Sequence, residues 1–341
     1  MKNLKFAVIG TGFWANYQIP AWFEVGGVEL LALYNRTRSK ADVLAQQFKV
    51  PYVYDRVEDL LDRHSPELDF VDIITDVDTH APLTALAASY GLDVICQKPM
   101  STGLEAARNM LEDSRRANVR LLIHENFRWQ APIRKLQEII NSGAIGKPFK
   151  ARLSFCSGFP VFANQPFLAD LEQFILTDIG SHLLDVCRFL FGEVASLYCQ
   201  TRRVNPRIKG EDVANVLMQM RSGLSCYAEM SYASILEKEA FPQTLAVVEG
   251  ETGSVVLTHD FQLRISTRQG TVLAEGNPTL YSWLDPAYAV VHSSIVDCNR
   301  NLLAGLRGTG RAETTAEDNF ETIRLVYAAY ESAARNEVVY L

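Results

Sequence analysis

The feature that most constrains this chain is a glycine-rich turn between an apolar run and a possible helix, within residues 4–22. Residues 4–9 are apolar without alternation after Lys5, which predicts a strand covered on both faces. Gly10-Thr11-Gly12-Phe13-Trp14-Ala15 follows, and the chain can then be helical up to Pro20. This is the G-x-G-x-x-A form of the dinucleotide fingerprint, in its required strand–turn–helix context.

Each small residue of the motif has a physical reason to be there. Gly10 permits the tight turn, Gly12 lets a pyrophosphate approach the backbone, and Ala15 lets the helix lie close to the strand. The helix N-terminus offers free N–H groups and a positive partial charge to phosphates. The alternative, that the glycines only form a turn, fits this context less well.

The end of the second predicted strand bears on the choice of cofactor. NAD-binding proteins usually place Asp or Glu there to bind the ribose hydroxyls, but this chain has Asn35, followed by Arg36 and Arg38. No carboxylate repels a 2′-phosphate, and two guanidiniums are able to bind one. The pattern leans towards NADP over NAD, although both arginines can equally be solvated surface charges.

Strands and helices alternate through the first part of the chain. Strands are predicted at 28–35, 68–75, 92–96 and 119–124, and helices at 36–48, 55–64, 80–90 and about 101–117. This alternation predicts a doubly wound parallel sheet, a Rossmann domain over residues 1–124. Ligands of such sheets bind at the carboxyl ends of the strands. The expected cofactor contacts are therefore Gly10, Thr11, Gly12, Phe13, Trp14, Asn35, Arg36, Arg38, Thr75, Asp76, His80, Gln97, Lys98 and Pro99.

The alternation stops after residue 125. Strand-like runs follow at 149–155, 194–201, 213–220, 225–232, 245–248, 255–258 and 263–267, with helices at 133–141, 178–191, 286–304 and 315–335. Hairpin turns at 221–223 and 250–253 join several of these runs. The pattern predicts a second, α+β domain over residues 125–341 with a mostly antiparallel sheet.

Composition narrows the class of protein. A chain of 341 residues with 48% hydrophobic residues is long enough for two cores. A net charge of −7 argues against nucleic acid or an anionic membrane as partner. We expect neither a signal peptide nor a membrane span, and the six scattered cysteines are typical of a reducing cytoplasm. Cysteine and histidine show no zinc-type spacing, so no metal is expected.

Two groups of residues carry candidate catalytic chemistry. Lys98 ends a buried strand on the expected cofactor edge, where an ammonium can hydrogen-bond a substrate hydroxyl. Asp178 and His182 are four residues apart in the first turn of a predicted helix capped by Thr177, so they share one face. An imidazole titrates near neutral pH and can accept a hydroxyl proton. The alternatives are a turn lysine at the surface and a capped helix with a solvated histidine.

A third group follows the strand at 119–124. Asn126 and Arg128 can bind a substrate hydroxyl or carboxylate, and Trp129 can stack on a sugar ring. The alternative for Arg128 and Trp129 is packing and an ion pair.

Together these pieces resemble one family. GTGFWA, QKP at 97–99, ENFRW at 125–129, DIGSHLLD at 178–185 and the helix around 316–333 occur in the order found in the glucose–fructose oxidoreductase/inositol 2-dehydrogenase (Gfo/Idh/MocA) family. The resemblance covers essentially the whole chain. It implies a Rossmann domain followed by an α+β domain with an open-faced sheet, and a last helix, about 315–335, that packs back near the first domain.

The resemblance also implies roles for individual residues. The family's catalytic lysine, aspartate and histidine fall on Lys98, Asp178 and His182, and the Lys98–Pro99 bond is expected to be cis. One departure stands beside Lys98, because Gln97 replaces the family's usual glutamate. The family's open sheet implies a homodimer or homotetramer.

The sequence therefore predicts a cytoplasmic NAD(P)-dependent oxidoreductase. It would transfer a hydride between nicotinamide and a carbinol carbon of a sugar, polyol or sugar acid. Two alternatives stay open: an NAD-dependent glycosidase of the same fold, and a non-catalytic dinucleotide sensor.

Overall fold

The computed structural model describes residues 2–341, and these divide into two compact units. Unit 1 comprises residues 2–126, Ser282–Leu284 and Ile295–Ile323. Unit 2 comprises Phe127–Tyr281, Asp285–Ser294 and Arg324–Leu341. The chain thus leaves unit 1 after Asn126 and returns to it twice. The predicted domain bounds, 1–124 and 125–341, stay a prediction, and Met1 lies outside the described residues.

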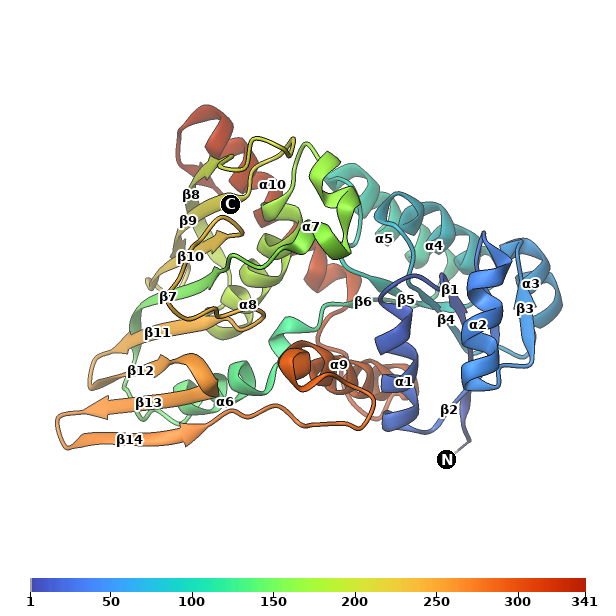
Figure 1. Cartoon of the computed structure of the whole chain (residues 1–341), viewed down its shortest axis with the longest axis horizontal. Helices are drawn as coiled ribbons and strands as arrows, with labels where there is room; N and C mark the ends of the chain where they lie inside the picture. The colour runs from blue at the N-terminus through green and yellow to red at the C-terminus, as the bar shows by residue number, and fades with distance from the viewer. Residues whose placement is uncertain (1) are drawn as a thin grey trace. The chain divides into compact units, whose positions relative to one another are not determined.

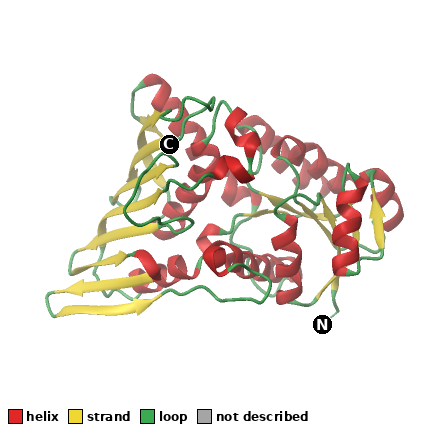
Figure 2. Ribbon diagram, viewed as in Figure 1, coloured by secondary structure: helices red, strands yellow, loops and turns green. Residues whose placement is uncertain are grey.

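Unit 1 is built on a parallel sheet (Figures 1 and 2). Among residues 2–341, six strands form it in the order β3-β2-β1-β4-β5-β6. The strands are β1 (Leu4–Ile9), β2 (Val28–Tyr34), β3 (Tyr52–Tyr54), β4 (Phe70–Ile73), β5 (Asp93–Gln97) and β6 (Leu121–His124). The helices are α1 (Ala15–Val25), α2 (Arg38–Phe48), α3 (Val57–His64), α4 (His80–Ser89) and α5 (Leu104–Ala117), with parts of α9 (Ala289–Arg307) and α10 (Ala316–Arg335).

The core of unit 1 lies between its sheet and its helices. The rings of Phe6 and Phe70 stack at 5.0 Å between centroids, and Trp22 of α1 packs on both. Burying this aromatic surface explains why α1 continues through Pro20 to Val25. The expected end of the helix at Pro20 is therefore wrong, because tertiary packing outweighs the hydrogen bond that proline cannot donate.

Unit 2 is built on a larger mixed sheet. Within the described residues, nine strands form it in the order β14-β13-β12-β11-β7-β10-β9-β8-β15, all neighbours being antiparallel except β7 and β10. The strands are β7 (Pro148–Cys156), β8 (Val194–Arg202), β9 (Val213–Met220), β10 (Ser225–Ser231), β11 (Leu245–Gly250), β12 (Gly253–Leu257), β13 (Gln262–Thr267), β14 (Gly270–Glu275) and β15 (Val339–Tyr340).

Helices cover one face of this sheet. Helix α8 (Ser181–Phe191) packs on β7 and β10, and α6 (Ala131–Asn141) packs on β12 and β13. The short helix α7 (Val161–Asn164) lies in the segment between β7 and α8. Along β9, buried Val216 and Met218 alternate with exposed Leu217, as expected for a sheet with one covered face.

The fold class is confirmed: a Rossmann unit and an α+β unit with a mostly antiparallel sheet. The strands β3, β14 and β15 were not predicted. Strands β3 and β15 are only three and two residues long, too short to show a pattern of period two. In β14, residues 270–273 are all exposed, so the strand has no buried alternation to detect.

Candidate cofactor and active-site residues

The glycine loop between β1 and α1 has the geometry that its sequence predicts. Gly10 has φ +105°, and a Cβ there would lie 2.4 Å from the carbonyl oxygen of Ile74, so only glycine fits. A Cβ at Gly12 would meet nothing within 4 Å. The backbone is therefore open at Gly12, and a pyrophosphate can approach it at the start of α1. The loop fits a dinucleotide.

Asn35 holds this loop from the end of β2. The backbone N–H of Thr11 donates to Oδ1 of Asn35 at 3.2 Å, and Nδ2 of Asn35 donates to the carbonyl of Thr37 at 3.0 Å. Of the two arginines nearby, Arg38 pairs with Asp42 at 3.8 Å, and Arg36 is exposed. On the same loop, the Phe13 ring packs edge-on against Trp14 and is 48% exposed.

His80 joins two loops at the carboxyl end of the sheet. Its Nδ1 lies 3.0 Å from the carbonyl oxygen of Pro99, and its Nε2 lies 3.1 Å from that of Thr75. Burial lowers the pKa of His80, and the two carbonyl partners oppose that shift. His80 therefore links the loop of Thr75 and the exposed Asp76 to the turn at Pro99. The Lys98–Pro99 bond is cis, as the resemblance implied.

In unit 2, Asp178 lies in a π-helical turn, Leu176–Gly180, that leads directly into α8. Thr177 is not a cap, because it lies inside the helical segment that begins at Ile175, and its hydroxyl donates to the carbonyls of Gln173 and Phe174 just before that segment. The predicted N-cap is therefore wrong. π-Turns occur often at functional sites.

Glu211 and Tyr232 hold the segment of Asp178, and sequence reasoning missed both. The Glu211 carboxylate accepts from the backbone N–H groups of Phe174 and Leu176, and from the Tyr330 hydroxyl at 2.6 Å. The Tyr232 hydroxyl hydrogen-bonds Asp178; burial, followed by the charge of Asp178, raises the pKa of Tyr232 well above its ordinary value. Neither residue lies near Asp178 in sequence, so no local pattern marks them.

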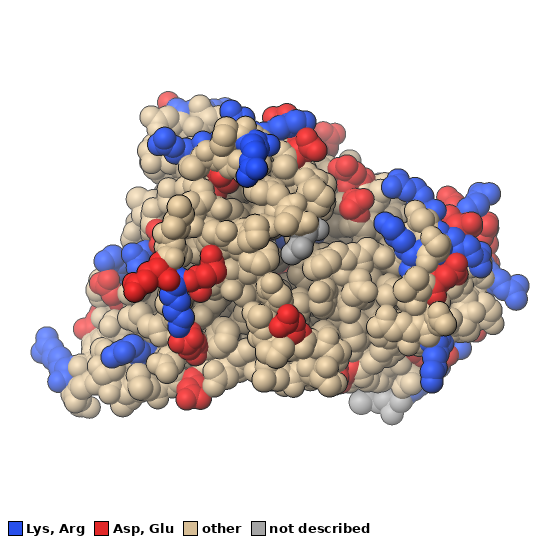
Figure 3. Space-filling view, viewed as in Figure 1, with Lys and Arg blue, Asp and Glu red and all other residues tan. Residues whose placement is uncertain are grey.

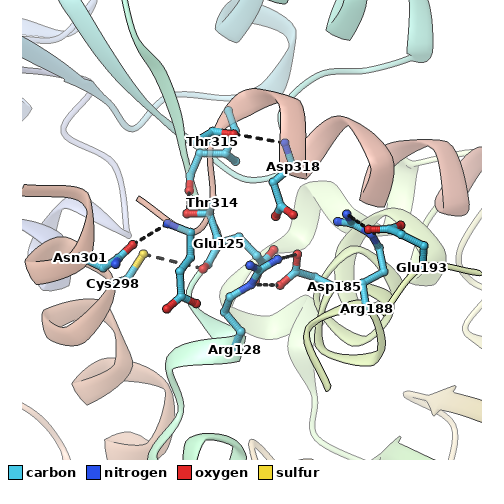
Figure 4. Close-up of polar contacts among 12 residues, drawn as sticks. Glu125, Arg128, Asp185, Arg188, Glu193, Cys298, Asn301, Thr314, Thr315 and Asp318 are labelled. Atoms are coloured by element: carbon cyan, nitrogen blue, oxygen red, sulfur yellow. Dashed lines mark hydrogen bonds and ion pairs between the residues drawn. The ribbon is translucent and has the colours of Figure 1, made fainter. Parts of the chain in front are cut away.

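The turn Phe127–Trp129 is attached to α8 by two adjacent side chains. Phe127 stacks on His182 with 3.7 Å between ring centroids. Arg128 is buried and donates from Nε and Nη2 to the two carboxylate oxygens of Asp185, at 2.8 and 2.5 Å, as Figure 4 shows. This bidentate pair supports the ion-pair alternative for Arg128 over substrate binding.

Trp129 and Asn126 complete the third group of candidates. The Arg134 guanidinium lies over the Trp129 ring, 3.4 Å from its centroid. Asn126 is buried and is the last residue of the first segment of unit 1. The candidates are therefore divided, since Lys98 and Asn126 belong to unit 1 whereas Asp178, His182, Arg128 and Trp129 belong to unit 2.

In residues 2–341, no three His, Cys, Asp or Glu side chains are grouped in a way that would hold a metal ion. On the face in Figure 3, acidic and basic side chains are interspersed. Within the same residues, no helix has the length and apolarity needed to cross a membrane.

Comparison with known proteins identifies the family. Residues 4–125 match the model of the oxidoreductase family with an NAD-binding Rossmann fold, and residues 133–256 match the GFO/IDH/MocA C-terminal domain. The chain belongs to the Gfo/Idh/MocA family. Membership confirms the resemblance, and with it an NAD(P)-dependent oxidoreductase that acts on CH–OH groups.

Relatives in the Gfo/Idh/MocA family match over nearly the whole chain. The D-apiose dehydrogenase of Rhizobium rhizogenes is 39% identical over 99% of this chain and 98% of its own length. That of Paraburkholderia graminis is 40% identical over 100% and 90%. A crystal structure of an oxidoreductase from Agrobacterium radiobacter, in complex with NAD+, L-tartaric acid and magnesium, is 39% identical with a TM-score of 0.96, covering 99% of this chain and 98% of that one.

Proposed function

We propose that this chain is an NAD(P)-dependent sugar dehydrogenase that oxidises a CH–OH group of D-apiose or of a sugar of similar size. The observation that carries the proposal is the full-length match, at about 40% identity, to two D-apiose dehydrogenases. The open backbone at Gly12 supports the binding of a dinucleotide.

In this proposal, His182 accepts the proton of the reacting hydroxyl. Its stack on Phe127 limits rotation of the imidazole. Asp178, held by Tyr232, orients His182, and Lys98 donates a hydrogen bond to the reacting oxygen. Bound NAD(P)+ would supply the acceptor for the hydride that leaves the carbon. Asn126 and Trp129 are proposed to shape the substrate site, whereas Arg128 orients the turn that carries Phe127.

We propose that this chain uses NADP+ in preference to NAD+, with NAD+ as the alternative. A solved relative binds NAD+. Arg36 is exposed beside Asn35 and remains available to a 2′-phosphate, whereas Arg38 is shared with Asp42. The preference for NADP that the sequence suggests therefore stays a proposal, and it rests on Arg36.

We also propose a homo-oligomer that associates through the uncovered face of the unit 2 sheet. A row of paired residues crosses that face: Tyr198, Leu217, Tyr227, Arg152 and Val247. None of them is buried, and Leu217 is 49% exposed. The apolar side chains among them, above all Leu217, favour an interface on this face. Light scattering of the purified protein tests the proposal.

A cytoplasmic location also stays a proposal, supported by the free thiols of the cysteines in residues 2–341.

A screen of D-apiose, other pentoses, hexoses and polyols tests the activity, with NAD+ and NADP+ in separate assays. We expect net formation of reduced cofactor to be fastest with D-apiose. Cofactor that co-purifies without net reduction by any sugar would instead favour the glycosidase alternative.

A further inference from the structure

A buried carboxylate lies in the middle of the parallel sheet of unit 1. Asp72 is on β4, paired with Val8 of β1 and Ile95 of β5, and its side chain is fully buried. A carboxylate in such a place needs hydrogen-bond donors. Gln18 of α1 donates from Nε2 to both carboxylate oxygens, at 2.8 and 2.9 Å, and Trp22 donates from Nε1 at 2.8 Å.

The hydrogen bonds continue from Gln18 to the turn of Lys98. Nε2 of Gln97 donates to Oε1 of Gln18 at 2.9 Å. The backbone N–H of Lys98 then donates to Oε1 of Gln97 at 2.8 Å. Both glutamines are buried. An unbroken line of hydrogen bonds therefore joins a carboxylate inside the sheet to the backbone of Lys98.

The two ends of this line fix its direction. An ionised carboxylate only accepts, so Gln18 must turn its NH2 group towards Asp72 and its oxygen towards Gln97. A backbone N–H only donates, so Gln97 must turn its oxygen towards Lys98 and its NH2 group towards Gln18. Each amide has one orientation that satisfies every bond. With Asp72 ionised, the side-chain amides of both glutamines are therefore held in a single orientation.

We propose that Asp72 is a positioning residue for Lys98, acting through Gln18 and Gln97. The ionised carboxylate sets the direction of the line, and the line holds the backbone of Lys98 in place. The proposal also explains Gln97, because a carboxylate at that position cannot donate to Gln18. Its consequence for catalysis rests on the proposed function of Lys98, whereas the hydrogen-bond line itself does not.

Single substitutions of Asp72 or of Gln97 each leave a fault in the line, meaning two neighbouring groups that both donate or both accept. In Asp72→Asn, the remaining oxygen still accepts from Gln18 and Trp22, but the new NH2 group faces the NH2 group of Gln18 and has no acceptor. If both glutamine amides rotate by half a turn, the mismatch moves to the N–H of Lys98. In Gln97→Glu, a second carboxylate faces the oxygen of Gln18. The double variant Asp72→Asn/Gln97→Glu removes both faults by reversing the line. Its asparagine donates to Gln18, Gln18 donates to the new glutamate, and the glutamate accepts from Lys98.

Hydrogen exchange of the Lys98 backbone amide, measured by NMR on the whole protein, tests this directly. Burial raises the pKa of Asp72 to about 7, so the measurement is made at a pH about one unit higher, where Asp72 is mostly ionised. We expect exchange to be about tenfold faster or more in each single variant, and within about threefold of wild type in the double variant. Gln47→Glu, which adds the same charge at an exposed position of α2, should change nothing. A double variant that exchanges as fast as the worse single variant overturns the proposal.

A kinetic test separates this proposal from the proposed function. With D-apiose and NAD+, kcat should fall in both single variants and recover in the double variant, while the NAD+ dissociation constant changes little between the singles and the double. The melting temperature should recover together with kcat, because each single variant leaves a buried polar group without its hydrogen bond. Recovery of the melting temperature without recovery of kcat would show a merely structural line and overturn the positioning role. Full activity of Lys98→Met would overturn the proposed role of Lys98, whereas the exchange result would still decide the hydrogen-bond line.

Discussion

The imidazole of His182 lies flat on the ring of Phe127, with 3.7 Å between centroids and 6° between planes. The next residue, Arg128, is bound to Asp185 three residues along the same helix. Phe127 and Arg128 thus attach one short turn to α8 at neighbouring points. We infer that the segment read from the sequence as a substrate-binding motif mainly fixes the orientation of the proposed base.

Removing the Arg128 guanidinium should therefore destabilise unit 2 severely. Arg128→Met removes the guanidinium that pairs with the buried Asp185 carboxylate, and we expect a loss of about 3–5 kcal/mol in the free energy of unfolding. Arg300→Met is the matched control. It removes an arginine whose pair with Asp297 is exposed, and should cost less than about 1 kcal/mol. Urea unfolding measures both. Equal losses in the two variants would contradict the structural role of Arg128.

The two glycines of the loop after β1 should respond differently to the same substitution. In Gly10→Ala, the added Cβ meets the backbone of Ile74 and the residue must keep a positive φ, so we expect the protein to lose several kcal/mol of stability or fail to fold. The free energy of unfolding of Gly12→Ala should lie within about 1 kcal/mol of the wild-type value, because the space around Gly12 is open. Its dissociation constant for NAD+ should nevertheless rise about tenfold or more, since the Cβ occupies the approach of the pyrophosphate. Normal NAD+ affinity of Gly12→Ala would contradict this account of the loop.

Cofactor choice should depend on Arg36. Arg36→Ala removes the guanidinium proposed to bind the 2′-phosphate, and we expect KM for NADP+ to rise about tenfold while KM for NAD+ is unchanged. Arg38→Ala is the comparison, and it should have the smaller effect because Arg38 is already paired with Asp42. Steady-state kinetics with each cofactor measure both. Unchanged NADP+ kinetics in Arg36→Ala would contradict the phosphate contact.

His292 should make the protein less stable in acid. Burial lowers the pKa of His292 to about 4, against an opposing effect of the charge of Asp285. Because the unfolded chain binds this proton near pH 6.5, stability is lost as the pH falls from about 6.5 to about 4, by up to about 3 kcal/mol. His292→Gln should remove that part of the pH dependence. His259→Gln, at a half-buried position, should keep it. Urea unfolding at several pH values in this range measures the free energy of unfolding of both variants. The same dependence on pH in His292→Gln and His259→Gln would contradict the account.

Local patterns were enough to predict the Rossmann unit and the glycine loop, whereas the catalytic pairing of Asp178 with His182 stays a prediction. The loop residues are adjacent in sequence, and the alternation of strands and helices has a regular period. The partners that orient the pair were not predictable. Tyr232 is distant from Asp178 in sequence, and Asp185 is 57 residues from Arg128, so only the fold brings each pair together.

The line from Asp72 to Lys98 shows the same limit. The sequence marked Gln97 as a departure from the family, but nothing local connected it with Asp72. Gln97 and Gln18 are 79 residues apart and meet only through the parallel sheet. The sequence thus marked Gln97 as unusual, and the structure shows that its side chain hydrogen-bonds Gln18 and the backbone of Lys98.

The central claim is that His182 accepts the hydroxyl proton during sugar oxidation by NAD(P)+. The most direct measurement is kcat for D-apiose with NAD+ in His182→Ala beside wild type, with the NAD+ dissociation constant of each protein. Loss of a positioned base predicts a kcat about 10²–10⁴-fold lower with NAD+ affinity nearly unchanged. A variant that oxidises D-apiose as fast as wild type would contradict the claim.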